Sequence, residues 1–284
     1  SVVNTVNIEI DWTFITCFSP QNKIYDIILV ITMEVDMLAV ITGASSGIGR
    51  ELALRLAERK YDLILIARRT ERLLEISNLL KNADIKVEIL SMDLANLDDC
   101  KNLLNTLKTR KIDLFVNNAG FGLYGASLDN DSDKEFQMLD LNIKTVHYLT
   151  KEISKIMSRG TIINISSMAA FLPTPLLASY AASKSYVYNY SMALAYELKQ
   201  NKVPINIMTV CPGPVKTEFN EVANASPKMK GLPVEKCVES ILKGLDKNKT
   251  LVIPSCKMRL LRFMLRFSPT KLLLKISYKI QSKK

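Results

Sequence analysis

Apolar runs of strand length alternate with longer segments of helical periodicity from residue 38 to residue 253. Several runs, such as LILIA and IDLFV, are apolar almost throughout, which is the pattern of strands whose sheet is covered on both faces. Strict alternation of strand and helix predicts a doubly wound α/β fold, with a seven-stranded parallel sheet flanked by helices and right-handed crossovers. We expect the strands at 38–42, 61–67, 86–90, 112–116, 161–166, 204–210 and 250–253, and the helices at 48–60, 70–82, 97–108, 133–157, 179–201 and 234–246.

The size and composition of the chain predict one large domain. With 284 residues, of which 48% are hydrophobic, the chain can bury a sizeable core, and it has no internal repeat. The five cysteines are odd in number and widely spaced, which disfavours a disulfide framework and favours a reducing, cytoplasmic location. With a single histidine, His147, a zinc site of His and Cys ligands is also disfavoured, and no metal is expected.

The two ends of the chain differ from this domain, which we expect at 37–256. Residues 1–36 are expected to be an N-terminal extension of unknown role, peripheral to function. Its apolar run at 24–32 is interrupted by Asp26 and is far shorter than the roughly 20 residues of a membrane-spanning helix. The run also lacks the preceding cations and the cleavage site of a signal peptide.

The positive charge is concentrated in a C-terminal tail, residues 257–284. The formal net charge is +10, and nine of the 38 lysines and arginines lie in this tail, which contains no acid. The other 29 cations nearly balance the 28 acids, so a nucleic-acid partner is not expected. Lysines recur at every fourth position in 271–279 while Leu and Ile gather on another side, as in a cationic amphipathic helix. Such a helix suits peripheral contact with a membrane, packing on the domain, or closure over a cleft.

The first predicted strand leads into a glycine-rich turn at 42–49, TGASSGIG, and a helix follows. Glycines permit a tight turn, and the helix N-terminus offers free N–H groups to a phosphate. The turn also matches the G-x-S-x-G elbow of α/β-hydrolases, whose chemistry needs a histidine in a loop after a late strand. His147 instead lies within a predicted helix. The hydrolase alternative is therefore disfavoured, and a dinucleotide phosphate is expected at the turn.

The residues after the second predicted strand indicate which dinucleotide binds. An NAD site usually places Asp or Glu roughly 20 residues beyond the glycines, where it accepts a hydrogen bond from the ribose 2′-hydroxyl. Here that place reads Ala67-Arg68-Arg69. A guanidinium group suits a 2′-phosphate, so NADP(H) is the expected cofactor, with Arg68 favoured over Arg69 as the phosphate ligand.

A tyrosine and a lysine indicate acid–base chemistry. Tyr180 and Lys184 are four residues apart near the start of a predicted helix, so both side chains leave on one face. A neighbouring ammonium is expected to lower the pKa of the tyrosine from about 10, which lets it exchange a proton with a substrate oxygen. Ser167, at the end of the fifth predicted strand, is placed to hydrogen-bond the same oxygen. A Tyr-x-x-x-Lys motif on its own is more often a helix-surface pair.

These motifs occur together in an order that resembles the classical short-chain dehydrogenase/reductase family. The resemblance covers roughly residues 37–255, and its C-terminal part also resembles the 17β-hydroxysteroid-type and acyl-chain reductases. It implies a Rossmann-like fold and hydride transfer between a nicotinamide and a carbonyl carbon, with reduction as the expected direction for NADPH. The resemblance rests on the turn at 42–49, Asn117-Asn118-Ala119-Gly120, Asn142, Ser167, Tyr180 with Lys184, and Pro212-Gly213.

The resemblance implies a role for each matched residue. Tyr180 is the acid–base group, Ser167 (or, as the alternative, Ser166) positions the substrate oxygen, and Lys184 tunes the tyrosine and binds the nicotinamide ribose. Asn142 is implied to hold a water in a proton relay with the lysine. The residues implied to contact the cofactor are Gly43, Ser45, Ser46, Gly47, Ile48, Gly49, Arg68, Arg69, Asp93, Asn118, Ala119, Gly120, Tyr180, Lys184, Pro212, Gly213, Val215 and Thr217.

The expected activity is NADPH-dependent reduction of a ketone or aldehyde to an alcohol. The alternative is a catalytically idle NADP-binding sensor or scaffold on the same fold. The segment 216–233 looks like a mobile lid, and the resemblance implies a homodimer or homotetramer. Nearly all positions expected to flank the substrate are apolar, which favours a hydrophobic carbonyl compound. These positions are Phe121, Leu123, Tyr124, Met168, Phe171, Leu172, Leu176 and Leu177.

Overall fold

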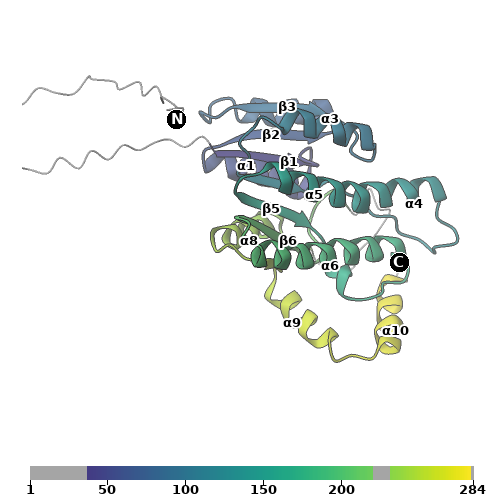
Figure 1. The fold of residues 1–284 in the computed structure, drawn as a ribbon. Coiled ribbons are helices and arrows are strands. Elements are labelled where there is room, and N and C mark those ends of the chain that lie inside the picture. The colour runs from purple at the N-terminus through teal and green to yellow at the C-terminus, as the bar shows by residue number, and fades with distance from the viewer. Residues whose placement is uncertain (1–36, 220–230, 283–284) are drawn as a thin grey trace, which may run out of the picture. The chain divides into compact units, whose positions relative to one another are not determined.

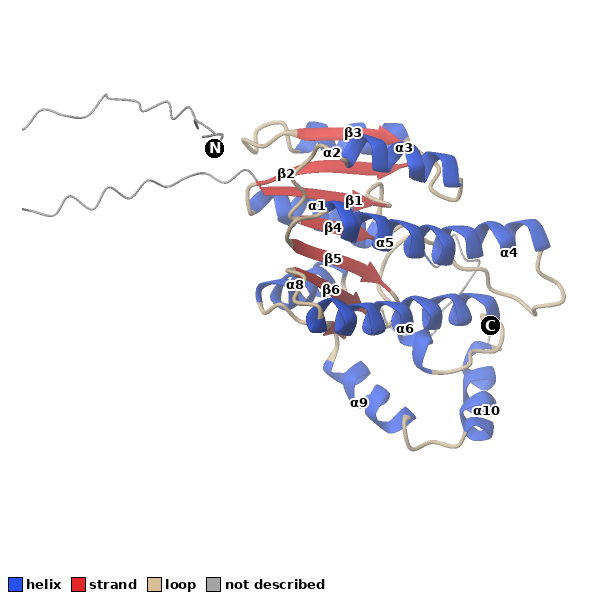
Figure 2. Ribbon diagram, viewed as in Figure 1, coloured by secondary structure: helices blue, strands red, loops and turns tan. Residues whose placement is uncertain are grey.

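A seven-stranded sheet runs through the middle of the protein, and helices cover both of its faces (Figures 1 and 2). The structure is a computed structural model in which residues 37–219 and 231–282 are described. All neighbouring strands pair in parallel. The predicted doubly wound, Rossmann-like α/β fold is therefore confirmed. The predicted extension at 1–36 lies outside the described residues.

The strands and helices follow the predicted alternation, and most of their ends differ from the prediction by a few residues. The strands are β1 (Met37–Thr42), β2 (Tyr61–Ala67), β3 (Val87–Ser91), β4 (Leu114–Asn117), β5 (Gly160–Ile165), β6 (Ile205–Val210) and β7 (Leu251–Val252). The helices are α1 (Gly47–Glu58), α2 (Thr70–Leu79), α3 (Leu97–Leu107), α4 (Ser132–Leu139), α5 (Val146–Ile156), α6 (Ala178–Gln200), α8 (Val234–Asp246), α9 (Cys256–Leu265) and α10 (Thr270–Gln281).

The hydrophobic core lies in two layers, one on each face of the sheet. Helices α1, α2 and α8 pack on one face, and α3, α5 and part of α6 pack on the other. Successive strand residues contribute to opposite layers: in β1, Ala39 and Ile41 belong to the first layer and Val40 to the second. Because both faces are buried, the strands are apolar along almost their whole length.

The strand order β3-β2-β1-β4-β5-β6-β7 reverses direction between β1 and β4. The chain winds from β1 to β3 toward one edge of the sheet and then from β4 to β7 toward the other. Loops leaving the carboxyl ends of β1 and β4 therefore run to opposite sides and leave a crevice, where ligands bind in such sheets. The glycine-rich turn follows β1, so the fold places it at this crevice.

The segment 133–157, predicted as one continuous helix, is divided in three. A π-helical turn at Asp140–Thr145 (η1) separates α4 from α5. This wide turn carries Asn142, whose Oδ1 accepts the Phe121 N–H (3.2 Å) and whose Nδ2 donates to the Phe121 carbonyl (2.9 Å). A π-helical turn widens the helix by one residue, and the hydrophobic pattern on either side of it still reads as helix.

The tail forms two helices, and the second contains the predicted amphipathic segment. These are α9 and α10, and Pro269 lies immediately before α10. The proline explains the break, because its ring cannot continue a preceding helix. Within residues 37–219 and 231–282, no helix has the length and apolar content needed to cross a membrane.

Four buried polar side chains join the sheet to α5 and α6. Asn117 of β4 donates to Asn164 Oδ1 of β5 (2.9 Å), and Asn164 Nδ2 donates to Ser191 Oγ of α6 (2.8 Å). Thr150 of α5 donates to Asn164 Oδ1 and accepts from Asn117, both at 3.1 Å. All four residues are buried. Since a buried polar group is tolerated only with its partners in place, this network fixes the two helices on the sheet.

Replacing the central member of this network is predicted to destabilise the fold. Asn164→Ala leaves the Asn117 amide and the Ser191 hydroxyl short of a partner where water does not reach. We expect the free energy of unfolding to fall by about 2–4 kcal/mol, measured by urea unfolding. Asn189→Ala, at an exposed position of α6, is the control and should change it by less than about 0.5 kcal/mol. Equal losses in the two variants would contradict a stabilising role for the network.

Candidate active site

A cleft of about 780 Å³ opens at the carboxyl ends of the strands. Its walls come from the ends of the strands, the loops that follow them, the start of α6 and the tail helices α9 and α10. Every residue predicted to contact the cofactor lines this cleft, with the exception of Gly49, and Ser167 lines it too. The fold therefore brings together predicted site residues that lie far apart along the chain.

Two positions of the turn after β1 require glycine. Gly43 has a φ of +64°, and a Cβ there would lie 2.8 Å from the Ala119 backbone. A Cβ on Gly49 would lie 2.4 Å from the Gly43 carbonyl oxygen. Only glycine thus allows the first turn of α1 to approach β1 so closely. Gly49 packs against the Gly43 carbonyl on the side of the turn away from the cleft, which explains why it does not line the cleft.

The N-terminus of α1 faces the cleft with its backbone donors available. Its N-cap, Ser46, makes no side-chain capping hydrogen bond. Gly47 and Ile48, which begin the helix, line the cleft. Because the first N–H groups of a helix have no partner within it and lie at the positive end of its dipole, they suit an anion. The residues present fit the diphosphate of a dinucleotide.

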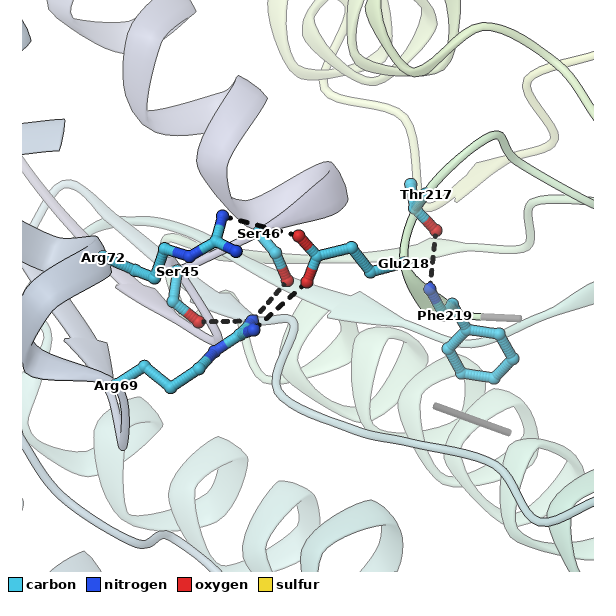
Figure 3. A network of polar contacts seen from close by, with 7 residues as sticks. All are labelled: Ser45, Ser46, Arg69, Arg72, Thr217, Glu218 and Phe219. Atoms are coloured by element: carbon cyan, nitrogen blue, oxygen red, sulfur yellow. Dashed lines mark hydrogen bonds and ion pairs between the residues drawn. The ribbon is translucent and has the colours of Figure 1, made fainter. Parts of the chain in front are cut away.

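A cationic pocket lies beside this turn (Figure 3). Arg69 Nη2 donates to the hydroxyl oxygens of Ser45 (3.2 Å) and Ser46 (3.0 Å). Its Nη1 lies 3.1 Å from the carboxylate of Glu218, whose other oxygen lies 3.5 Å from Arg72 Nη1. Two guanidinium groups therefore face one carboxylate, contributed by the loop after β6, and two serine hydroxyls hold one of these guanidinium groups.

The other arginine predicted for the cofactor, Arg68, has a different partner. Its Nη1 lies 3.8 Å from Asp93 Oδ2. Both residues line the cleft, but neither contacts the serines of the glycine-rich turn. The preference for Arg68 over Arg69 as phosphate ligand stays a prediction, and the hydrogen bonds to Ser45 and Ser46 favour Arg69.

Three residues of the predicted catalytic set meet in the cleft. The side chains of Tyr180 and Ser167 both line the cleft, and Ser167 is near enough to act on the pKa of the tyrosine. Lys184, one turn along α6, places its Nζ 5.8 Å from the centroid of the Tyr180 ring and donates to the Ile165 carbonyl (3.0 Å). Tyr180 and Lys184 are both buried, at 9% and 5% exposure. The spacing in the sequence thus places the two side chains together, as predicted.

The pKa of Tyr180 differs from the expectation. Burial raises it to about 12, and Ser167 opposes this only in part. Burial also lowers the pKa of Lys184 to about 8. Desolvation disfavours the charged form of each group, and the lysine is held by a backbone carbonyl rather than by the tyrosine hydroxyl. In this structure burial therefore outweighs the expected effect of the ammonium on the tyrosine.

The two neighbouring serines have separate tasks. Ser166 is buried, and its hydroxyl donates to the Lys184 carbonyl (2.8 Å), which fixes α6 on the end of β5. Ser167 lines the cleft beside Tyr180, at the start of a 3₁₀ turn, Met168–Phe171. Only Ser167 is therefore placed to reach a ligand.

Asn142 lies behind the cleft rather than in its wall. It is fully buried, and besides its bonds to Phe121 it donates to Ser183 Oγ (3.2 Å). A Cβ on Gly120 would lie 2.8 Å from Asn142 Oδ1 and 3.4 Å from Lys184 Nζ. Because Gly120 has no side chain, the Asn142 amide and the Lys184 ammonium can both lie next to its backbone. The predicted water relay through Asn142 stays a prediction.

The loop after β6 closes the cleft toward the glycine-rich turn. A Cβ on Gly47 would lie 3.2 Å from the Thr217 methyl group, and Thr217 Oγ1 accepts the Phe219 N–H at 3.3 Å (Figure 3). The Phe219 ring lies 5.4 Å from that of Tyr180. At the base of the predicted lid, the Leu232 N–H donates to the Pro214 carbonyl (2.8 Å). Residues 220–230 of that lid lie outside the described part.

The tail lines the cleft. The sequence alone did not decide between this position and contact with a membrane. Arg262 of α9 donates to the Tyr188 hydroxyl (3.0 Å), and its guanidinium lies 4.8 Å from the Phe171 ring. At the far end, the Tyr124 hydroxyl donates to the Gln281 carbonyl of α10. Of the eight predicted substrate positions, Phe121, Tyr124, Met168, Leu172 and Leu177 line the cleft, and the tail adds Met258, Leu261, Met264, Leu265, Ser268, Leu273, Ile276, Ser277, Ile280 and Gln281.

His147 takes no part in the cleft. It lies on α5, and its Nδ1 is 2.8 Å from the Tyr186 hydroxyl on α6. Ser45, the candidate nucleophile of the hydrolase alternative, instead accepts a hydrogen bond from Arg69. The serine thus has a partner that cannot act as a general base, which agrees with rejection of that alternative.

The lowered pKa of Lys184 predicts a pH dependence of stability. Its folded value of about 8 lies below the ordinary 10.5, so folding releases a proton from this group between these pH values. The cost of burying the ammonium is complete below about pH 8 and disappears as the pH rises to 10.5. Lys184→Met should raise the free energy of unfolding most below pH 8, and this advantage should shrink above it.

Urea unfolding of both proteins at about pH 7 and about pH 10 measures the effect. Other titrating groups are common to the two proteins and cancel in the difference. An advantage of Lys184→Met that is the same at both pH values would show that the lysine is not desolvated as described.

Comparison with known proteins agrees with this geometry. The family described as short chain dehydrogenase matches residues 37–228. A 3β-hydroxysteroid dehydrogenase of Mediterraneibacter gnavus is 32% identical over 200 residues, which are 68% of this chain and 71% of that protein. For the next two curated relatives the matched part spans 60% and 54% of the relative.

Two solved structures share the fold. A short-chain dehydrogenase from Sphingobium yanoikuyae in complex with NADPH superposes with a TM-score of 0.76 at 28% identity, covering 83% of this chain and 94% of that one. A short chain dehydrogenase/reductase from Burkholderia phymatum in complex with NAD gives a TM-score of 0.74 at 21% identity, covering 80% and 92%. The family match spans most of the chain and includes the glycine-rich turn, Ser167, Tyr180 and Lys184, but not the tail helices. The chain therefore belongs to the short chain dehydrogenase family of nicotinamide-dependent oxidoreductases.

Proposed function

We propose that this protein uses NADPH to reduce a hydrophobic ketone or aldehyde to the alcohol, with Tyr180 as the proton donor. The observation that carries the proposal is the meeting of Tyr180, Ser167 and Lys184 in a cleft that also contains the uncapped N-terminus of α1. One end of the cleft can therefore hold a dinucleotide while the other presents an acid to a carbonyl oxygen.

The chain's own residues supply the proton and the positioning. When bound, the nicotinamide supplies a hydride to the carbonyl carbon. Tyr180 transfers its hydroxyl proton to the carbonyl oxygen, which leaves a tyrosinate. The raised pKa keeps this hydroxyl protonated at neutral pH. Ser167 hydrogen-bonds the same oxygen. The Lys184 ammonium, whose Nζ lies 5.8 Å from the centroid of the Tyr180 ring, offsets the charge of the tyrosinate.

The cationic pocket supports NADP(H) over NAD(H). Arg69, held between two serine hydroxyls, and Arg72 present donors to one carboxylate, that of Glu218. A 2′-phosphate offers the same charge-assisted hydrogen bonds with more oxygens. The similar structures are bound to NADPH in one case and to NAD in the other, so the proposal rests on this pocket. Lys184 would hold the nicotinamide ribose and the loop Pro212 to Thr217 the nicotinamide.

The lining of the cleft supports a hydrophobic substrate. Beyond Tyr180 the walls are mainly Phe, Met, Leu and Ile side chains from the loops after β4 and β5 and from the tail helices. Arg68 and Arg69 lie instead at the end expected to hold the cofactor. The relative named a 3β-hydroxysteroid dehydrogenase has a large apolar substrate by name, which agrees with this class of compound.

Removing the Tyr180 hydroxyl tests the proposed chemistry. Tyr180→Phe should lower kcat/KM for carbonyl reduction by about 10²–10⁴-fold, the usual contribution of a positioned acid. The measurement is NADPH oxidation with a panel of apolar ketones and aldehydes. NADPH affinity, measured by fluorescence titration, should change little.

Tyr186→Phe, on the same helix, is the matched control and should keep full activity. If the native protein binds NADPH but reduces no carbonyl of the panel, the catalytically idle sensor or scaffold becomes the better description. Equal activity of Tyr180→Phe and the native protein would exclude this tyrosine as the acid.

Glu218 should act as a competitor for the 2′-phosphate. Glu218→Gln removes the carboxylate from the cationic pocket, so affinity for adenosine 2′,5′-bisphosphate should rise by about two- to tenfold. Affinity for ADP, which lacks the 2′-phosphate, should change less. Calorimetric titration of both ligands gives the comparison. Glu75→Gln, at an exposed position of α2, makes the same change in net charge and should affect neither. A similar gain for both nucleotides would contradict a site for the 2′-phosphate at Arg69.

A further inference from the structure

The outer side of α9 carries an apolar ridge that no part of the described chain covers. The ridge consists of Leu260 and Phe263, three residues apart on one side of α9, and of Phe267, just beyond the end of the helix. Their exposures are 62%, 61% and 75%. The two phenylalanine rings pack edge to face, with centroids 5.2 Å apart. The exposed side chains therefore form one continuous apolar surface and are not isolated from one another.

The inner sides of the tail helices are already in use. Met258, Leu261 and Leu265 of α9 line the cleft. Arg262, on the side of α9 next to these residues, contacts Tyr188 and Phe171 of the domain. These contacts fix the rotation of α9 about its axis. The helix cannot turn the ridge inward without removing the cleft wall and breaking the Arg262 contacts.

Exposed apolar side chains are concentrated in the tail. Seven large hydrophobic residues are exposed between residues 37 and 255 of the described part, and ten are exposed in the much shorter tail. Four of those ten, Leu261, Met264, Ile276 and Ile280, line the cleft. The cleft therefore accounts for fewer than half of the exposed large apolar residues of the tail.

Cations flank the ridge. Lys257, Arg259 and Arg266 are exposed on α9 and at its end, and the next helix, α10, also exposes Lys271, Lys275 and Lys279. Residues 257–282 contain no acid. An apolar strip bordered by uncompensated cations complements a surface that is apolar inside and anionic at its rim.

We propose that the outer side of α9 and α10 docks on an anionic phospholipid surface. The ridge enters the boundary between headgroups and acyl chains, and the flanking lysines and arginines contact the lipid phosphates. Helices of ten and twelve residues are too short to span a bilayer, so the tail lies on the surface. Lipid is favoured over a folded protein partner because the charge beside the ridge has one sign and no acid of the tail accompanies it. The cleft wall formed by the same helices then lies next to the membrane.

Flotation of the full-length protein with lipid vesicles tests this. We expect flotation with vesicles of phosphatidylcholine and phosphatidylglycerol, none with phosphatidylcholine alone, and a loss at high salt. The variant Leu260→Ser/Phe263→Ser/Phe267→Ser should bind the anionic vesicles at least tenfold more weakly. Leu128→Ser/Phe136→Ser, which replaces exposed apolar residues outside the tail, should bind like the native chain.

A second pair of variants separates charge from apolar contact. Lys257→Gln/Arg259→Gln/Arg266→Gln should also lose binding, whereas Lys81→Gln/Lys111→Gln/Lys134→Gln, at exposed positions elsewhere, should retain it. Circular dichroism shows whether each variant is folded. If the triple ridge variant is not, Phe267→Ser alone, just beyond the end of α9, replaces it. No flotation of the native chain with anionic vesicles, or equal loss in the two charge variants, would overturn the proposal.

Discussion

The site depends on a close contact between the turn after β1 and the loop after β4. Thr42 Oγ1 donates to the Val116 carbonyl (3.1 Å) and accepts the N–H groups of Asn118 and Ala119 (3.0 Å each). The Asn118 amide in turn donates to the carbonyls of Thr42 and Gly43 (3.0 Å each). These bonds satisfy polar groups at the switch point of the sheet, where two strands end beside each other and loops diverge. The N-terminus of α1 is held at the cleft because this contact is tight.

Tyr180, the proposed acid–base group, is placed by a second set of contacts, on the other side of that switch point. Ser166 and Lys184 fix the start of α6 on the end of β5 through backbone carbonyls. This fixation buries Tyr180 and keeps its pKa high. Reduction needs a neutral tyrosine hydroxyl that gives up a proton only when charge develops on the substrate oxygen. Burial of Tyr180 therefore suits a proton donor in the reductive direction, and the nearby ammonium of Lys184 can stabilise the tyrosinate after transfer.

Much of the fold and of the cleft could be predicted from local sequence. Runs such as LILIA are apolar because both faces of the sheet are covered, and the glycines of the turn are needed for steric reasons that any chain with this turn shares. Contacts over long sequence separations could not be predicted. Glu218 meets Arg69 across 149 positions, and no local pattern identifies that partner. The predicted direction of the Tyr180 pKa shift was wrong for a related reason. The spacing in the sequence shows that Lys184 is near, whereas the desolvation of Tyr180 depends on every residue that covers its side chain.

The tail shows how one amphipathic pattern can serve two surfaces. A helix with a lysine at every fourth position was expected either to lie on lipid or to close over the cleft. In α10, Leu273, Ile276 and Ile280 line the cleft, while Lys271, Lys275 and Lys279 lie on the side away from them. Closing the cleft uses only one side of the helix, so it leaves the cationic side free. The two expectations therefore do not exclude each other, and the charge that first distinguished the tail belongs to the side that the domain does not use.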